Sequence, residues 1–150
     1  QDPAYGIRQM VDIAVKSLSA AVNNPATAMN SLDYLASVVS LLITRRMPRR
    51  CRYDDGQLRL VGREPSLEFI IDLAFGEIRQ NSGSQVVVVL QLLMALERVA
   101  ESRPMLSDRL KLLRNQAQLT LQTAEQNIRF APDLERIRRR AAALTAPKPG

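Results

Sequence analysis

The feature that most constrains the fold is the recurrence of aliphatic residues at steps of three and four along the chain. Ile7, Val11, Ala14 and Leu18 follow this spacing in the opening segment. Side chains spaced in this way share one face of an α-helix, so each such segment predicts a helix with one packed face. The segments that show the pattern are 2–18, 25–45, 66–81, 86–99 and 104–129, followed by a short basic helix that ends at Leu144.

Helix starts are marked by polar residues that precede proline or an apolar run. Asp2 comes before Pro3, and Asn24 comes before Pro25. A side-chain oxygen at such a position accepts a hydrogen bond from an exposed backbone N–H, and proline lacks the N–H that the first helical position leaves unpaired. The first two helices are therefore expected to begin at these prolines, and Ser84 is expected to cap the fourth helix.

One segment departs from the helical pattern. Cys51-Arg52-Tyr53 and Leu58–Val61 are short extended runs on either side of Asp54-Asp55-Gly56-Gln57, which is a turn signal. The predicted fold class is therefore mainly α, with about five to six helices in antiparallel packing and one short β-hairpin near residues 51–61. No repeat of fixed period is present, so a solenoid is not expected.

The chain is expected to be a single soluble helical domain over residues 1–145, with a disordered tail at 146–150. Its most apolar run, Val86–Leu96, is about half of what a membrane span requires. The lone Cys51 excludes an internal disulfide and favours a reducing compartment. The formal net charge of +6 permits anionic partners, but a solvated basic surface is the favoured explanation, because charge alone argues for solubility rather than function.

The opening residues also carry a family pattern. The segment from Asp2 to Ala28 closely resembles D-P-A-F-G-x-R-Q-L-V-D-I-A followed by S-P-x-x-N-D-P-x-T-A, and Leu73–Gln80 is similar to L-A-F-D-Q-I-R-Q. These patterns are typical of a family of predicted bacterial membrane proteins of unknown function. The resemblance implies that the chain is the C-terminal soluble portion of a longer protein. The arginine excess and the lone cysteine then favour the cytoplasmic face of the bacterial inner membrane, beside the membrane-embedded part of the same protein.

Asn24 departs from this family pattern, which has aspartate at that position. Asn and Asp cap a helix almost equally well, but only Asp offers a negative charge to a metal or a proton. The departure therefore argues for a helix start at this turn and against carboxylate chemistry.

A polar pocket between the first two helices is the leading candidate for a ligand site. Arg8, Asp12 and Lys16 recur at steps of four and form a charged line, although such lines commonly only support the helix. Buried amides beside that line would need hydrogen-bond partners. The candidate ligand-binding residues are Arg8, Gln9, Asp12, Asn23, Asn24 and Thr27.

The sequence offers no set of residues that would form a catalytic site or a metal site. The chain has no histidine, which excludes His-dependent triads and His metal sites. Cys51 lies among arginines that would favour its thiolate, but no base accompanies it. Asp54-Asp55-Gly56 lacks the further ligands of a calcium loop. The chain is therefore expected to be no enzyme, with no catalytic residue, no bound metal and no cofactor.

Two arginine clusters are candidates for contact with an anionic surface. They consist of Arg45, Arg46, Arg49, Arg50 and Arg52, and of Arg138, Arg139 and Arg140. Lipid headgroups are the favoured partner, at about 1 kcal/mol per basic residue near a membrane. Nucleic acid is disfavoured as a partner because few aromatic residues are interleaved with the arginines.

Three functions remain open from the sequence. The first is a noncatalytic assembly or regulatory domain that forms a homo-oligomer through an apolar helical face. The second is a small-ligand-binding module that uses the pocket between the first two helices. The third is nucleic-acid or anionic-lipid binding through the arginine clusters.

Overall fold

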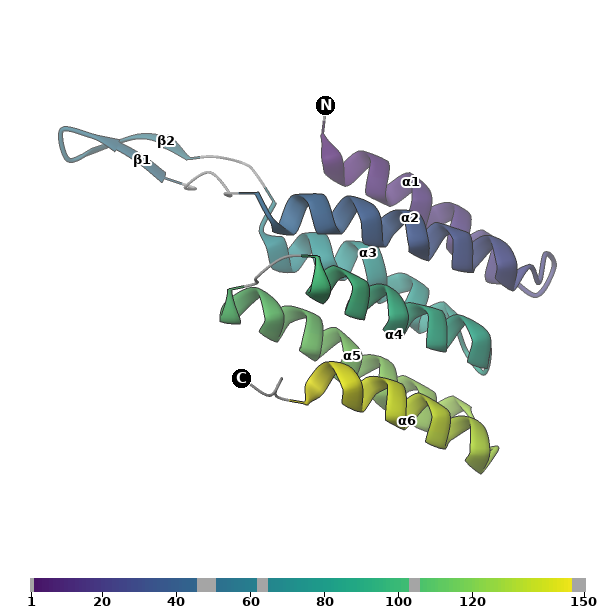
Figure 1. Cartoon of the computed structure of the whole chain (residues 1–150). Coiled ribbons are helices and arrows are strands. Elements are labelled where there is room, and N and C mark those ends of the chain that lie inside the picture. The colour runs from purple at the N-terminus through teal and green to yellow at the C-terminus, as the bar shows by residue number, and fades with distance from the viewer. Residues whose placement is uncertain (1, 46–50, 62–64, 103–105, 147–150) are drawn as a thin grey trace.

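The computed structural model describes residues 2–45, 51–61, 65–102 and 106–146, and within the strands it describes side chains only for residues 55–57. The expected tail at 146–150 falls outside this range except for Ala146. The described chain forms six helices and one pair of strands (Figure 1). In chain order these are α1 (Pro3–Leu18), α2 (Pro25–Ile43), β1 (Cys51–Asp54), β2 (Gln57–Val61), α3 (Leu67–Asn81), α4 (Val86–Glu101), α5 (Ser107–Asn127) and α6 (Ala131–Thr145).

Successive helices form three antiparallel units, α1–α2, α3–α4 and α5–α6, which stack side by side (Figure 1). α1 packs closely on α2 and α5 on α6, whereas α3 and α4 contact each other little and pack mainly on the neighbouring units. α1, α3 and α5 form one layer, while α2, α4 and α6 form the other. Helices within a layer run in the same direction, and successive helices run in opposite directions. This is the geometry of helical repeat arrays, reached here without a repeat of fixed period in the sequence.

The core lies between the two layers and is almost entirely aliphatic. Leu32, Leu92, Leu96 and Leu113 are fully buried and come from three different helices. Phe75 on α3 is the largest fully buried side chain. Burial of each such side chain contributes about 1.5–3 kcal/mol, so the helices are held together mainly by the apolar faces that the sequence periodicity indicates.

The predicted caps of α1 and α2 are confirmed. The carboxylate Oδ1 of Asp2 accepts a hydrogen bond from the Ala4 backbone N–H at 2.9 Å, and Asn24 Oδ1 accepts one from the Thr27 N–H at 3.2 Å. The prediction for Ser84 is wrong, because α4 begins one residue later, after Gln85, whose side chain makes no capping hydrogen bond. The turn before α4 is built instead on backbone hydrogen bonds and on Gly83 at a φ of +54°.

The strands β1 and β2 pair antiparallel through a two-residue turn at Asp55 and Gly56, both with positive φ. In the part of the chain that the structure describes, these strands contact each other, whereas every other extensive contact joins two helices. The predicted fold class, mainly α with a hairpin, therefore needs a correction. The packed body is six helices with no strand among them, and β1 and β2 lie beyond the helix ends (Figure 1).

Among the residues that the structure describes, one helix is long and apolar enough to cross a membrane by length and composition alone, and it is α2 rather than the apolar run in α4. The core helix of a soluble protein passes the same test. In this structure α2 packs against α1, α3 and α4, which is how a core helix behaves. Only 39% of its most apolar window is buried, however, so part of its apolar surface stays uncovered.

Candidate functional site

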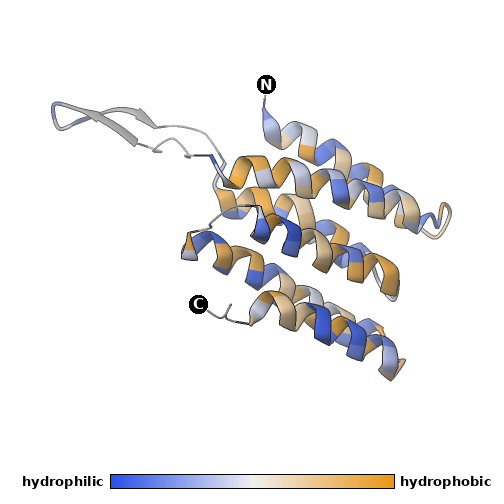
Figure 2. Ribbon diagram, viewed as in Figure 1, coloured by the Kyte–Doolittle hydropathy of each residue, from blue (hydrophilic) through white to orange (hydrophobic). Residues whose placement is uncertain are grey.

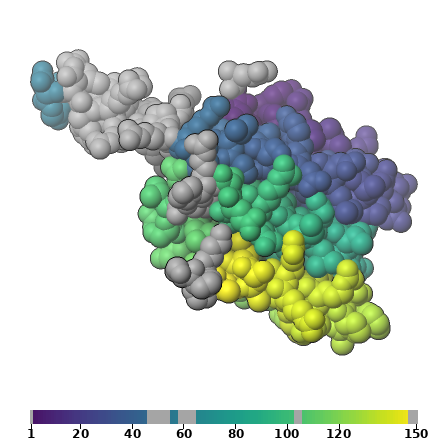
Figure 3. Space-filling view, in the orientation of Figure 1, coloured from purple at the N-terminus to yellow at the C-terminus, as the bar shows by residue number. Residues whose placement is uncertain are grey.

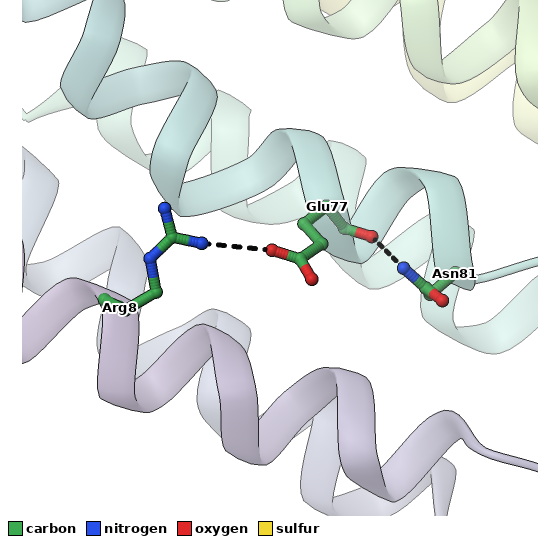
Figure 4. Close-up of polar contacts among 3 residues, drawn as sticks. All are labelled: Arg8, Glu77 and Asn81. Atoms are coloured by element: carbon green, nitrogen blue, oxygen red, sulfur yellow. Dashed lines mark hydrogen bonds and ion pairs between the residues drawn. The ribbon is translucent and has the colours of Figure 1, made fainter.

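The residues expected to form a pocket between α1 and α2 do not converge on one point. Arg8 points away from α2 and toward α3, where its Nη1 lies 3.3 Å from Glu77 Oε2 (Figure 4). Glu77 also accepts a hydrogen bond at its backbone oxygen from the Asn81 side chain (Figure 4). The charged line on α1 therefore contributes an ion pair between helices. Among the described residues, Asp12 and Lys16 form no ion pair.

The remaining candidates of that pocket have separate partners. Gln9 is exposed and donates a hydrogen bond to the Tyr5 hydroxyl at 3.0 Å, within α1. Asn23 has a φ of +44° in the α1–α2 turn and accepts a hydrogen bond from Gln85 Nε2 at 3.3 Å. Asn24 and Thr27 are joined by the capping hydrogen bond of α2.

The arginine cluster on α6 is paired with acids. Arg138 Nε lies 3.0 Å from Glu125 Oε1 on α5, and Arg140 Nη2 lies 3.1 Å from Glu97 Oε2 on α4. Arg139 pairs with Glu135 one turn earlier on α6 at 3.2 Å. These carboxylates neutralise much of the positive charge that the sequence places on this helix.

The other arginine cluster is described only at its edges. Arg45 follows the end of α2 and is exposed. Arg46, Arg49 and Arg50 lie outside the described residues, and Arg52 is described only as part of the backbone of β1. Within the described ranges, no group of three or more Cys, Asp or Glu side chains is placed to hold a metal ion.

An apolar surface lies on the outer side of α2 and α4. Tyr34 and Leu41 on α2 are seven residues apart, as are Val87 and Met94 on α4, so each pair projects from one side of its helix. All four side chains are exposed, and Leu41 is the most exposed at 61%. The two helices lie side by side at the surface (Figure 3). These four residues are named here the α2–α4 face.

Two opposite charges accompany the α2–α4 face. Asp33 on α2 accepts a hydrogen bond from Gln91 Nε2 at 2.6 Å, and Arg98 on α4 donates one to Ser37 Oγ at 3.2 Å. Both hydrogen bonds cross from one helix to the other. Within the described chain, neither Asp33 nor Arg98 belongs to an ion pair, so both charges are available to a partner.

Two hollows border α3 in the opposite layer. One has a volume of about 310 Å³ and lies between α3 and α5, and the other, of about 320 Å³, lies between α1 and α3. Phe69 and Asp72 line both of them. Gln116 lines the first, and the Arg8–Glu77 ion pair lines the second.

Asp72 is held in place between these hollows. Its Oδ1 accepts a hydrogen bond from Gln116 Nε2 on α5 at 3.2 Å. The same oxygen lies 2.8 Å from where a Cβ on Gly76 would be, so the absence of a side chain at position 76 leaves room for the carboxylate. Neither Asp72 nor Gln116 was expected from the sequence as a site residue. The available signal was a glycine inside a helix, which costs about 1 kcal/mol relative to Ala, four residues after an aspartate.

Comparison with known proteins identifies the family. The chain is 36% identical over 103 residues to the uncharacterized protein Rv1290c of Mycobacterium tuberculosis, and equally to the uncharacterized protein Mb1321c of Mycobacterium bovis. The aligned part covers 68% of this chain but only 20% of the length of these relatives. No solved structure matches the chain. The family of predicted membrane proteins named DUF2254 matches residues 1–98, and the chain therefore belongs to this family.

Proposed function

We propose that this chain is a noncatalytic assembly domain that pairs with a second copy of itself through the α2–α4 face. The whole protein is a member of a family of predicted membrane proteins, and the chain spans 20% of its curated relatives. Pairing of this domain would bring two membrane-embedded parts together. It would also allow a signal received by this domain to regulate the membrane-embedded part.

The observation that carries the proposal is the uneven distribution of exposed apolar side chains. The α2–α4 face holds four large ones, whereas α5 and α6 hold none within their helical bounds among the residues that the structure describes. Figure 2 shows the contrast, with a run of hydrophilic residues on α6 and a largely hydrophobic α2. A contiguous exposed apolar patch of this kind marks a surface where another protein surface packs.

The charges on this face favour a second copy as the partner. A two-fold interface brings the same surface of both chains together, so the surface must complement itself. Asp33 and Arg98 carry opposite charges on adjacent helices, and a two-fold pairing can set Asp33 of each chain against Arg98 of the other. The charged pairs would then lie along the seam between α2 and α4, flanked by the apolar side chains of the face.

Placement on the cytoplasmic side of the membrane is part of the proposal. The basic excess supports it, because arginine and lysine near membrane spans are enriched on the cytoplasmic side. The single cysteine is consistent with a reducing compartment. Contact of this domain with lipid is less well supported, since the α6 arginines are paired with acids.

Charge reversal tests the pairing directly. Sedimentation velocity of the 150-residue chain over a wide concentration series is expected to show the mass rising from one chain to two. Asp33→Arg and Arg98→Asp are each expected to shift the transition to higher concentration, because each sets like charges against each other across the interface. The double variant restores both pairs and is expected to dimerise again.

Lys111→Glu provides the matched control, since it reverses an exposed charge on α5, away from the α2–α4 face. This variant should change from monomer to dimer at the same concentration as the unaltered chain. A chain that stays monomeric at every concentration would refute pairing between copies. The α2–α4 face would then be assigned to contact with another part of the same polypeptide. Failure of the double variant to recover would refute the two-fold arrangement of Asp33 and Arg98.

A further inference from the structure

The interface between α3–α4 and α5–α6 contains buried polar atoms that lack partners. Three polar side-chain contacts cross this interface, and they join Asp72 to Gln116, Arg79 to Thr123, and Glu97 to Arg140. One member of each contact also has a buried atom with no hydrogen-bond partner among the described protein groups, namely Gln116 Oε1, Arg79 Nε and Arg140 Nε. In the described chain no other buried side-chain nitrogen or oxygen is in this state. Since each such atom costs free energy, the interface is weakened at three places.

The interface between α1–α2 and α3–α4 shows no such defect in the described chain. Its polar side-chain contacts lie at the exposed edge, and they join Arg8 to Glu77, Asp33 to Gln91, and Ser37 to Arg98. The buried hydroxyls of Ser17 and Ser31 donate to backbone oxygens of their own helices. The buried part of this interface is therefore apolar or satisfied.

α5–α6 also contributes less apolar side-chain volume to the core than α1–α2. The buried hydrophobic residues within the bounds of α5 and α6 are Leu113, Ala117, Ala124, Ile137, Ala141 and Leu144, so half of them are alanine. α1 and α2 bury more hydrophobic residues, and most of those are Val, Leu or Ile. Hydrophobic stabilisation grows with the apolar area that is buried. α5–α6 is therefore held to α3–α4 more weakly than α1–α2 is.

α3 and α4 have their strongest support from the first unit. α3 packs most extensively on α1, and α4 packs most extensively on α2. The family match, residues 1–98, contains α1, α2, α3 and nearly all of α4, but none of α5 or α6. One direct contact joins α5 to the first unit, where the Arg109 guanidinium donates to the backbone oxygens of Ile43 and Arg45 at the end of α2. Arg45 is exposed, so water can replace Arg109 there.

We propose that α5–α6 is a detachable cover, which opens away from α3–α4 as one unit while α1–α4 stays folded. Opening gives the unpartnered atoms of Arg79, Gln116 and Arg140 access to water, which offsets part of the lost packing. It uncovers the side of α3 and α4 on which α5 and α6 pack, so the closed state keeps that side from other partners. The cover and the α2–α4 face are separate surfaces, and opening does not depend on pairing between copies.

Native-state hydrogen exchange of the 150-residue chain tests the proposal, followed by NMR at a concentration where the chain is monomeric. A lone helix pair buries too little apolar surface to stay folded, so opening exposes the backbone amides of α5 and α6 to exchange. The most protected amides of α5 and of α6 are expected to share one protection factor, about tenfold or more below that of α1–α4. Equal protection in all three units, lowest protection in α1–α2, or reduced protection in α6 alone would each overturn the proposal.

Ile7→Val and Ile137→Val form a matched pair of variants, since both side chains are fully buried, one on α1 and the other on α6. Ile7→Val weakens a part that stays folded when the cover opens. It should lower the protection of α1–α4 about two- to tenfold and leave that of α5–α6 unchanged. Ile137→Val weakens contacts that exist only in the closed state, so it should lower the protection of both parts by the same factor. A drop throughout the chain with Ile7→Val would show that the chain unfolds as a single unit, and would refute the detachable cover.

Discussion

Gly76→Ala is the substitution whose outcome depends most directly on the arrangement of Asp72. Alanine inside a helix is normally about 1 kcal/mol more favourable than glycine. Here its Cβ would lie 2.8 Å from Asp72 Oδ1, so the carboxylate must swing away and release Gln116 Nε2. A buried NH₂ left without an acceptor costs about 1–3 kcal/mol. The net expectation is a loss of about 0–2 kcal/mol of stability.

The same substitution should change sign when Asp72 is absent. In an Asp72→Ala background the carboxylate is gone and Gln116 has already lost its acceptor, so Gly76→Ala should stabilise the chain by about 1 kcal/mol. Urea unfolding followed by helical circular dichroism gives the four free energies of unfolding of this double-mutant cycle. The expected coupling energy is about 1–3 kcal/mol. Equal stabilisation in both backgrounds would show that Gly76 does not serve to accommodate Asp72.

Three further substitutions test other parts of the structure by the same unfolding measurement. Asn24→Ala should cost about 0.5–2 kcal/mol because it removes the cap of α2, whereas Asn24→Asp should be nearly neutral, and equal losses would exclude capping. Leu92→Ala should cost about 2–5 kcal/mol at a fully buried position, and Leu106→Ala, at 67% exposure, should stay within about 0.5 kcal/mol. Arg8→Ala should cost less than about 1 kcal/mol because its ion pair with Glu77 is exposed on both sides, and a larger loss would mean that the pair holds α1 to α3.

Local features of the fold could be predicted from the sequence because they depend on neighbouring residues. The starts of α1 and α2 follow from a capping side chain and a proline within two positions. The core follows from aliphatic spacing, which indicates which side of each helix is buried. Ser84 shows the limit of this reasoning, since a residue with the right chemistry is displaced from the cap by the geometry of the turn before α4.

Contacts between distant segments could not be predicted. Arg8 has an acid four residues away at Asp12, yet it pairs with Glu77, because the packing of α1 beside α3 brings a second acid within reach. Asp72 and Gln116 are 44 residues apart and meet only because α3 and α5 lie in the same layer. The order of helices within a layer cannot be read from one sequence, so the hydrogen bond between Asp72 and Gln116 is seen only in the structure.

The stacking of the helix pairs also determines how cooperatively the chain can fold. α3–α4 makes extensive contact with both other pairs, whereas α1–α2 and α5–α6 have no extensive contact with each other in the described structure. In such a one-dimensional array, stability is a sum of intrinsic terms and nearest-neighbour interfaces. Unfolding α1–α2 or α5–α6 breaks one interface, but unfolding α3–α4 breaks both. The central pair thus couples the two ends of the domain, so a conformational change in α1–α2 affects α5–α6 through α3–α4.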